Sequence, residues 1–207
     1  LNQKLQPQCL IGNKHHQTPN EVEDIQIFER DLRCENKAGL SGQDIRRLPL
    51  ESCQTINDHW GYNITDTLYK SPKELIQMLV RAAGKNANLL LNIGPEPGGA
   101  LPDLALNRLK AMGEWLKQYG ETIYGTRGGI IAPHDWGVST QRGNKLYVHI
   151  LDCMDSSLYL PTGNRKVKSA KVFATGKPVR FTKTGDGITV NMDEAPKEID
   201  YVLELTL

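Results

Sequence analysis

The chain has 207 residues, 39% of them hydrophobic, which is enough for one large domain or two small ones with ordinary apolar cores. Its 25 basic and 24 acidic residues are well mixed, give a net charge of +1 and form no basic stripe, which argues against a nucleic-acid partner. The longest apolar run, residues 87–93, contains two Asn residues and is shorter than a membrane span. Because the chain begins at Leu1 without an initiator Met, we expect it to be part of a longer polypeptide.

The cysteines are widely spread and include no Cys-x-x-Cys pair, which argues against a zinc knuckle. Cys9 and Cys53 lie in apolar runs, so we expect both to be buried as small hydrophobic residues. Residues 7–13 predict a short buried strand, and the segment that follows it begins with Lys14, His15 and His16. Adjacent histidines point apart, so without a third ligand nearby we expect solvated or substrate-facing side chains rather than a metal site.

Residues 24–29 alternate between polar and apolar side chains, which predicts a short strand within the otherwise irregular, charged segment 19–50. This segment brings several carboxylates close together, and carboxylates in a loop can act as acids or bases. Composition alone favours simple solvation of these groups, which are Glu21, Glu23, Asp24 and Glu29.

Residues 50–56 predict the next strand, and the loop after it has an unusual composition. An amide, a carboxylate, an imidazole, an indole and a phenol occur together there. Hydrogen-bonding groups beside flat apolar rings suit a sugar, although a surface loop with one buried Trp would have the same composition. The residues concerned are Asn57, Asp58, His59, Trp60 and Tyr62.

A helix is predicted to begin at Pro72, because Ser71 and Glu74 have the spacing of a capping box, and to end at Gly84. Its expected buried residues are Leu75, Met78, Leu79 and Ala82.

Residues 87–93 predict a third strand that is buried on both faces, and residues 102–119 a second helix that stops at Gly120. The alternation of strands and helices, with polar loops after the strands, is typical of a β/α barrel with its active site in those loops. Three strands cannot close a barrel, so either partner strands lie in further N-terminal sequence or the sheet is open.

After Thr126 the pattern changes to short alternating runs separated by turns, of which residues 184–187 are a clear hairpin turn. We predict an antiparallel β-sandwich of residues 127–207 after an α/β portion of residues 1–126. We expect Trp136 and Tyr147 to pack in the sandwich core.

Several separate motifs in this order closely resemble the α-L-fucosidases of glycoside hydrolase family 29. The likeness covers nearly the whole chain and is strongest over residues 51–125. The matching residues are Glu51, 53–56, 60–62, 69–71, 74–76, 88–95, Trp115 and 120–125.

The resemblance implies that residues 1–126 are the C-terminal portion of a (β/α)8-like catalytic barrel and residues 127–207 a β-sandwich. It implies hydrolysis of terminal α-linked L-fucose from oligosaccharides or glycoconjugates, with retention of configuration and without a metal or organic cofactor. Retention requires a nucleophilic carboxylate and an acid/base carboxyl about 5 Å apart. The missing N-terminal half of the barrel would then be the structural partner of this chain. The enzyme would act in the periplasm, outside the cell or in the lysosome.

The family's Asp nucleophile has no counterpart here, so we expect it upstream. The family's acid/base pattern, Asp-x-Gln-x-x-Glu, matches residues 24–29 and assigns the role to Glu29. Burial beside Phe28 would raise the pKa of Glu29, as an acid requires. Glu51 is the rival candidate, and an ion pair with Arg30 or Arg33 is the structural alternative for Glu29.

The resemblance makes Trp60 the aromatic residue that contacts fucose, and Trp115 a structural residue. Lys14 stands where many relatives carry a sugar-binding Arg, although a Lys lacks the bidentate fork. The remaining substrate-binding candidates, expected to face the leaving group, are Asp58, His59, His15 and His16.

A non-catalytic carbohydrate-binding or scaffold protein derived from the same fold is the alternative function. An upstream barrel half with an Asp after a strand would support the enzyme. In either case we expect the isolated 207-residue chain to be inactive.

Overall fold

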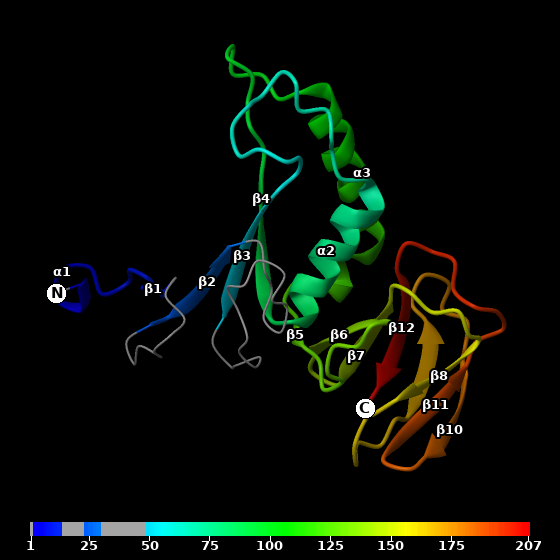
Figure 1. The fold of residues 1–207 in the computed structure, drawn as a ribbon. Coiled ribbons are helices and arrows are strands. Elements are labelled where there is room, and N and C mark those ends of the chain that lie inside the picture. Colours follow the sequence, from blue (N-terminus) through cyan, green and yellow to red (C-terminus); the bar gives the residue numbers. More distant parts are fainter. Residues whose placement is uncertain (1, 14–22, 30–48) are drawn as a thin grey trace.

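The computed structural model describes residues 2–13, 23–29 and 49–207 and contains a parallel sheet, two long helices and two antiparallel sheets (Figure 1). After the short helix α1 (Asn2–Leu5), the parallel sheet has the order β1-β2-β3-β4, so each strand lies beside the next one in sequence. Its strands are β1 (Gly12–Asn13), β2 (Ile25–Glu29), β3 (Leu50–Thr55) and β4 (Ala87–Asn92).

The predicted buried strand over residues 7–13 is wrong in extent and in burial. Only Gly12 and Asn13 pair with β2, Leu10 is 72% exposed and Cys9 is exposed as well. Within the described residues, β1 is an edge strand and no second strand covers its outer side. The apolar character of this run therefore does not lead to burial.

Helix α2 (Pro72–Gly84) confirms the predicted capping box. The Ser71 hydroxyl accepts a hydrogen bond from the Glu74 N–H at 3.2 Å, and Glu74 Oε2 accepts one from the Ser71 N–H at 2.7 Å. Leu75 and Ala82 are buried as expected, whereas Met78 and Leu79 are only partly buried and Ile76 and Val80 take their place in the core.

Helix α3 (Asp103–Tyr119) packs on α2, and the 3-10 helix η1 (Gly120–Thr122) follows it directly. Trp115 is buried between the helices and stacks on Tyr119 with ring centroids 5.3 Å apart, which agrees with the structural role expected for it. Of the described helices, none combines the length and the apolar character that crossing a bilayer requires.

The two faces of the parallel sheet have different surroundings. Phe28, Leu50 and Leu89 point toward α2 and form a small apolar cluster with Ala82. On the opposite face Leu90 is 44% exposed, because no described element covers it. The expectation that the strand over residues 87–93 is buried on both faces is therefore wrong for the described structure.

The C-terminal part is a sandwich of antiparallel sheets, as predicted, with the orders β5-β6-β7-β12-β9 and β10-β11-β8. The hairpin turn between Thr184 and Gly187 is confirmed, and Tyr147 and Trp136 pack in or against the core. The division after residue 126 stays a prediction. The strands are β5 (Arg127–Gly128), β6 (Gly137–Arg142), β7 (Lys145–Ile150), β8 (Ser157–Leu160), β9 (Ser169–Val172), β10 (Arg180–Thr184), β11 (Gly187–Asn191) and β12 (Tyr201–Thr206).

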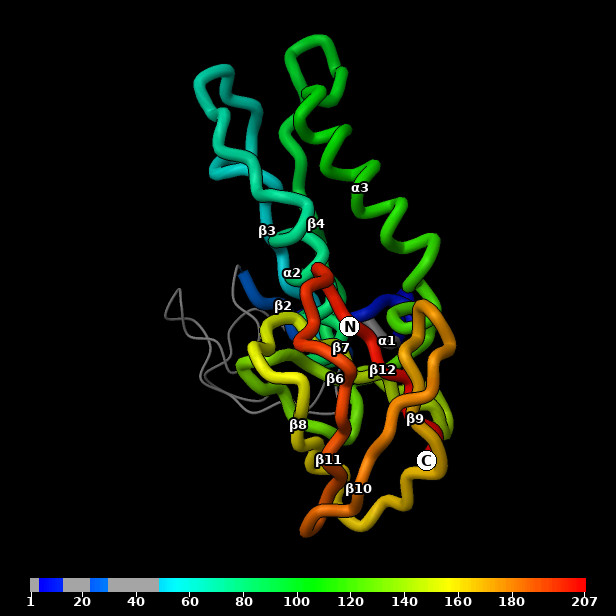
Figure 2. The backbone as a smooth tube through the Cα atoms, turned by 90° about the vertical axis from the view of Figure 1, so that its right-hand side faces the viewer, coloured from blue at the N-terminus to red at the C-terminus, as the bar shows by residue number. Residues whose placement is uncertain are grey.

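Helix α2 connects the two parts of the structure, since it lies between β4 and the sandwich strand β6 (Figures 1 and 2). Val138 of β6 belongs to the same apolar cluster as the buried face of α2. The Gln77 side-chain amide donates to the carbonyl oxygens of Leu151 at 3.0 Å and Ile199 at 2.9 Å. The sandwich is thereby fixed to the helical layer of the parallel sheet.

Candidate active site at the carboxyl ends of the parallel strands

The strands β2, β3 and β4 run in the same direction and end at Glu29, Thr55 and Asn92. Thr55 pairs with Asn92 in the ladder, so the loops of residues 56–71 and 93–102 leave the sheet side by side. Both loops rise beyond the ends of β3 and β4 in Figure 1. In β/α folds, side chains at this edge form the binding site.

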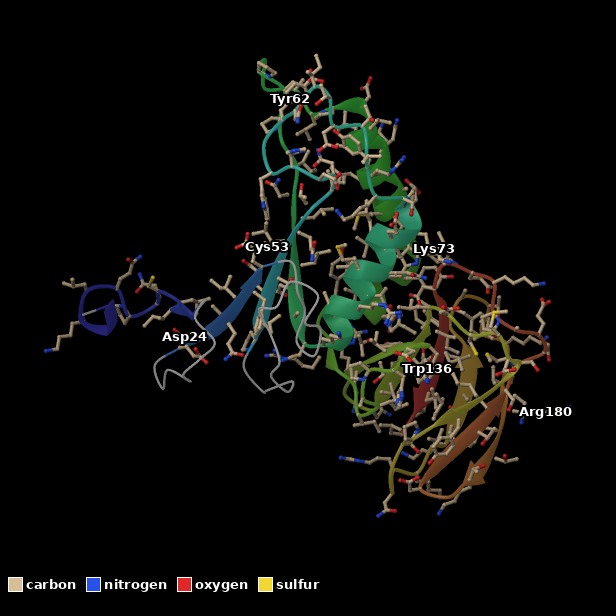
Figure 3. The ribbon with its side chains drawn as sticks, in the orientation of Figure 1. Asp24, Cys53, Tyr62, Lys73, Trp136 and Arg180 are labelled. Carbon is tan, nitrogen blue, oxygen red and sulfur yellow. The ribbon has the colours of Figure 1, made fainter. Side chains whose placement is uncertain are left out.

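Glu29 is the last residue of β2 and pairs with Cys53 of β3, which Figure 3 labels in the middle of the sheet. Ile27 pairs with Glu51, and side chains alternate along a strand, so Glu29, Cys53 and Glu51 share the face opposite α2. Glu51 lies two residues farther from the carboxyl edge than Cys53 does. Of the Glu29 and Glu51 carboxyls, that of Glu29 therefore lies nearer the carboxyl edge of the sheet.

Phe28 does not have the role expected for it. It is fully buried on the face toward α2, whereas Glu29 belongs to the opposite face. The apolar ring therefore cannot supply the surroundings that would raise the pKa of Glu29. Arg30 and Arg33, the possible ion-pair partners of Glu29, lie outside the described residues, as do Lys14, His15 and His16.

Trp60 is presented at the surface, with 37% of its area exposed, so the alternative of a buried Trp in this loop is wrong for the described structure. Its backbone is fixed to the sheet, because the Asn92 side-chain amide donates to the Trp60 carbonyl oxygen at 2.7 Å. The following residues touch the neighbouring loop so closely that a Cβ on Gly94 would lie 2.4 Å from the Tyr62 nitrogen. Tyr62, labelled at the tip in Figure 3, is exposed like Trp60.

Asp66 accepts hydrogen bonds from several residues of the same loop. Its Oδ2 atom accepts hydrogen bonds from Asn57 Nδ2 at 2.9 Å and from the backbone N–H groups of Asp58 and His59 at 3.1 Å. His59 Nδ1 lies 2.8 Å from the same oxygen. The hydrogen bond from His59, followed by the backbone donors, lowers the pKa of Asp66 below its usual value of 3.8.

The loop is also closed at its base. Lys70 Nζ donates to the carbonyl oxygens of Thr55 at 2.6 Å and Asn57 at 3.2 Å, where the loop leaves β3. Two predicted substrate-binding residues, Asp58 and His59, are exposed on this rigid loop. Sequence reasoning missed Asp66, Lys70 and Asn92. Asn92 carried a signal, because it stands at the carboxyl end of a predicted strand, and Lys70 lies in a stretch that matches the family.

The composition of this loop suits a sugar, since the exposed side chains of Asp58, His59 and Trp60 follow one another and supply a carboxylate, an imidazole and an indole. Within residues 2–13, 23–29 and 49–207, no three His, Cys, Asp or Glu side chains are grouped so as to hold a metal ion.

Comparison with known proteins shows the family to which the chain is similar. A family model described as α-L-fucosidase matches residues 1–121. Rat plasma α-L-fucosidase is 31% identical over 154 residues, which are 69% of this chain and 34% of the rat protein. The α-L-fucosidase of Dictyostelium discoideum is 29% identical over 175 residues, which are 75% of this chain and 38% of the relative.

Solved structures agree over the full length of the chain. α-L-Fucosidase isoenzyme 1 from Paenibacillus thiaminolyticus superposes with a TM-score of 0.79 and 36% identity, covering 99% of this chain and 51% of that one. The Thermotoga maritima α-fucosidase in complex with fucose has a TM-score of 0.74 and 25% identity, covering 99% and 46%. The chain therefore belongs to the α-L-fucosidase family and corresponds to the C-terminal part of these enzymes, with about half the length of the solved relatives.

Proposed function

We propose that this chain is the C-terminal part of a retaining, exo-acting α-L-fucosidase that releases terminal α-linked L-fucose from oligosaccharides or glycoconjugates. Support comes from the family match and from one structural observation: Glu29 ends a parallel strand at the same edge of the sheet at which Asn92 holds the Trp60 loop. A proton donor and a flat apolar ring at one edge are what cleavage of a deoxy sugar needs.

In the proposed mechanism an upstream Asp carboxylate attacks C1 of fucose while Glu29 gives its proton to the departing glycosidic oxygen, and the C1–O bond breaks. Glu29 then removes a proton from water, the water oxygen attacks C1, and the Asp carboxylate is released. Trp60 packs on the apolar face of fucose. Lys14 binds a hydroxyl of fucose, and the side chains that face the leaving group are His15, His16, Asp58 and His59.

The partly exposed sheet face that carries Glu29 and Leu90 is proposed to be the inner wall of a (β/α)8-like barrel, completed by N-terminal chain. The site requires no metal or organic cofactor in this proposal. Relatives named plasma α-L-fucosidases support a secreted location, and the periplasm and the lysosome are the alternatives in this proposal. The 207-residue chain alone is then inactive, because it lacks the nucleophile.

The test uses the complete polypeptide and compares Glu29→Ala with Glu51→Ala. Glu29→Ala should slow hydrolysis of fucosides with poor leaving groups far more than hydrolysis of activated aryl fucosides, because only poor leaving groups need the proton. Equal slowing of both substrates would refute the assignment to Glu29. Binding of fucosylated oligosaccharide by a complete wild-type protein that hydrolyses neither substrate would indicate the alternative, a non-catalytic carbohydrate-binding protein.

A further inference from the structure

The exposed imidazole of His59 is held by a buried carboxylate. Asp66 has a side chain only 2% exposed, whereas that of His59 is 57% exposed, and their contact is 2.8 Å. Three further donors converge on the same Asp66 oxygen, the Asn57 amide and the backbone N–H groups of Asp58 and His59. The Leu68 N–H donates to its other oxygen at 3.3 Å. Asp66 is therefore an ionised acceptor whose position is fixed by the loop itself.

The contact with Asp66 determines which ring nitrogen of the neutral His59 carries the hydrogen atom. A carboxylate can only accept, so Nδ1 must be the N–H donor to Asp66. In the neutral ring Nε2 is then an acceptor, and in the described structure no protein group contacts it.

The position of His59 indicates which part of the substrate its Nε2 atom would contact. Glu29 lies level with Cys53 within the sheet, whereas His59 lies beyond Thr55, in the loop that continues outward from β3. Its carbonyl oxygen lies 3.0 Å from the Thr55 hydroxyl, so the residue is tied to the strand end. Because the leaving group extends outward from the proton donor, a side chain of this loop can reach the sugar to which fucose is attached.

We propose that Asp66 is a positioning residue that orients His59 so that Nε2 binds a hydroxyl of the sugar to which fucose is attached. The dyad would thereby select saccharide leaving groups over simple aryl ones. This inference rests on the proposed function, and it adds the residue that orients His59 and the part of the substrate that His59 contacts.

The experiment uses the complete polypeptide, with a fucosylated lactose and 4-nitrophenyl α-L-fucoside as substrates. His59→Ala should lower kcat/KM for the fucosylated lactose about tenfold, the effect of losing one hydrogen bond, and leave the aryl fucoside within about twofold. Asp66→Ala should act in the same direction because the ring loses the acceptor that fixes its orientation. His134→Ala, which removes an exposed histidine on the sandwich side, should change neither substrate.

Nitrogen-15 NMR of the His59 ring supplies a readout that does not depend on activity. The wild type should show the Nδ1–H tautomer, and Asp66→Ala, which removes the acceptor, should show the mixture typical of a free imidazole. The inference is overturned if His59→Ala slows both substrates equally, if it slows neither, or if wild-type His59 is not in the Nδ1–H form. A wild-type protein that hydrolyses neither substrate but shows this tautomer would instead refute the proposed function.

Discussion

The imidazole of His149 and the carboxylate of Asp200 form a fully buried pair, with Nδ1 2.9 Å from Oδ2. The other ring nitrogen, Nε2, lies 3.2 Å from the Thr140 hydroxyl, which donates its own proton to the Thr122 carbonyl oxygen at 2.6 Å. Nε2 must therefore be a donor. The pair is then either imidazolium with carboxylate or neutral imidazole with carboxylic acid, and it connects η1 with the sandwich strands β6 and β7.

Asp200→Ala should lower the free energy of unfolding by about 3–5 kcal/mol, because it leaves the Nδ1 atom of a buried imidazole without a partner. Asp200→Asn should lower the free energy of unfolding clearly less, since the new side-chain amide can donate to His149 Nδ1 while Nε2 still donates to Thr140. Urea denaturation of the complete polypeptide measures both. Equal losses for the two variants would contradict the proton assignment.

Gly84 at the end of α2 touches the sandwich, and a Cβ there would lie 2.4 Å from the Cβ of Val138. Gly84→Ala should therefore destabilise the protein by about 1–3 kcal/mol through overpacking. Gly113→Ala is the matched control, because Gly113 lies within α3 and a Cβ there would meet nothing within 4 Å. It should stabilise by about 0.5–1 kcal/mol. A stabilising effect of Gly84→Ala would show that α2 and β6 are not in close contact.

The stability that Asp66 contributes should depend on pH. Its pKa is lower in the folded protein than the usual 3.8, so the contribution is complete above that value and is lost as the pH falls through the lower folded-state pKa. The melting temperature of Asp66→Asn should therefore lie below that of the wild type at pH 6, and the gap should shrink as the pH falls below about 4. A gap that stays constant from pH 6 to pH 3 would show that the Asp66 charge does not hold the loop.

Local signals in the sequence were sufficient to predict parts of the fold. The capping box of Ser71 and Glu74 depends on residues three positions apart, so the start of α2 was predictable. The sandwich followed from alternation and turn residues. Strand β6 shows no apolar alternation, because its Ser139 and Thr140 are buried polar residues that donate to the carbonyl oxygens of Ile131 and Thr122. A buried polar side chain whose hydrogen-bond partner is distant in sequence does not produce the alternation of apolar and polar residues by which a strand is predicted.

The positions of candidate site residues were predictable only for residues at or just after the end of a strand. Glu29 and Trp60 stand at or after strand ends, and both lie at the same edge of the sheet. The error about Phe28 came from treating a sequence neighbour as a spatial one, although adjacent strand residues face opposite sides. Asp66 and Asn92 were missed because their function depends on hydrogen bonds to residues seven or more positions away in sequence.

The most direct test of the account is chemical rescue of Glu29→Ala in the complete polypeptide, assayed with an aryl fucoside in the presence of sodium azide. If Glu29 is the acid/base of a retaining mechanism, azide should take the place of the activated water and give α-L-fucosyl azide, identified by proton NMR, with Glu51→Ala as the control that gives none. Formation of the β-azide, or rescue of Glu51→Ala in place of Glu29→Ala, would contradict the role assigned to Glu29.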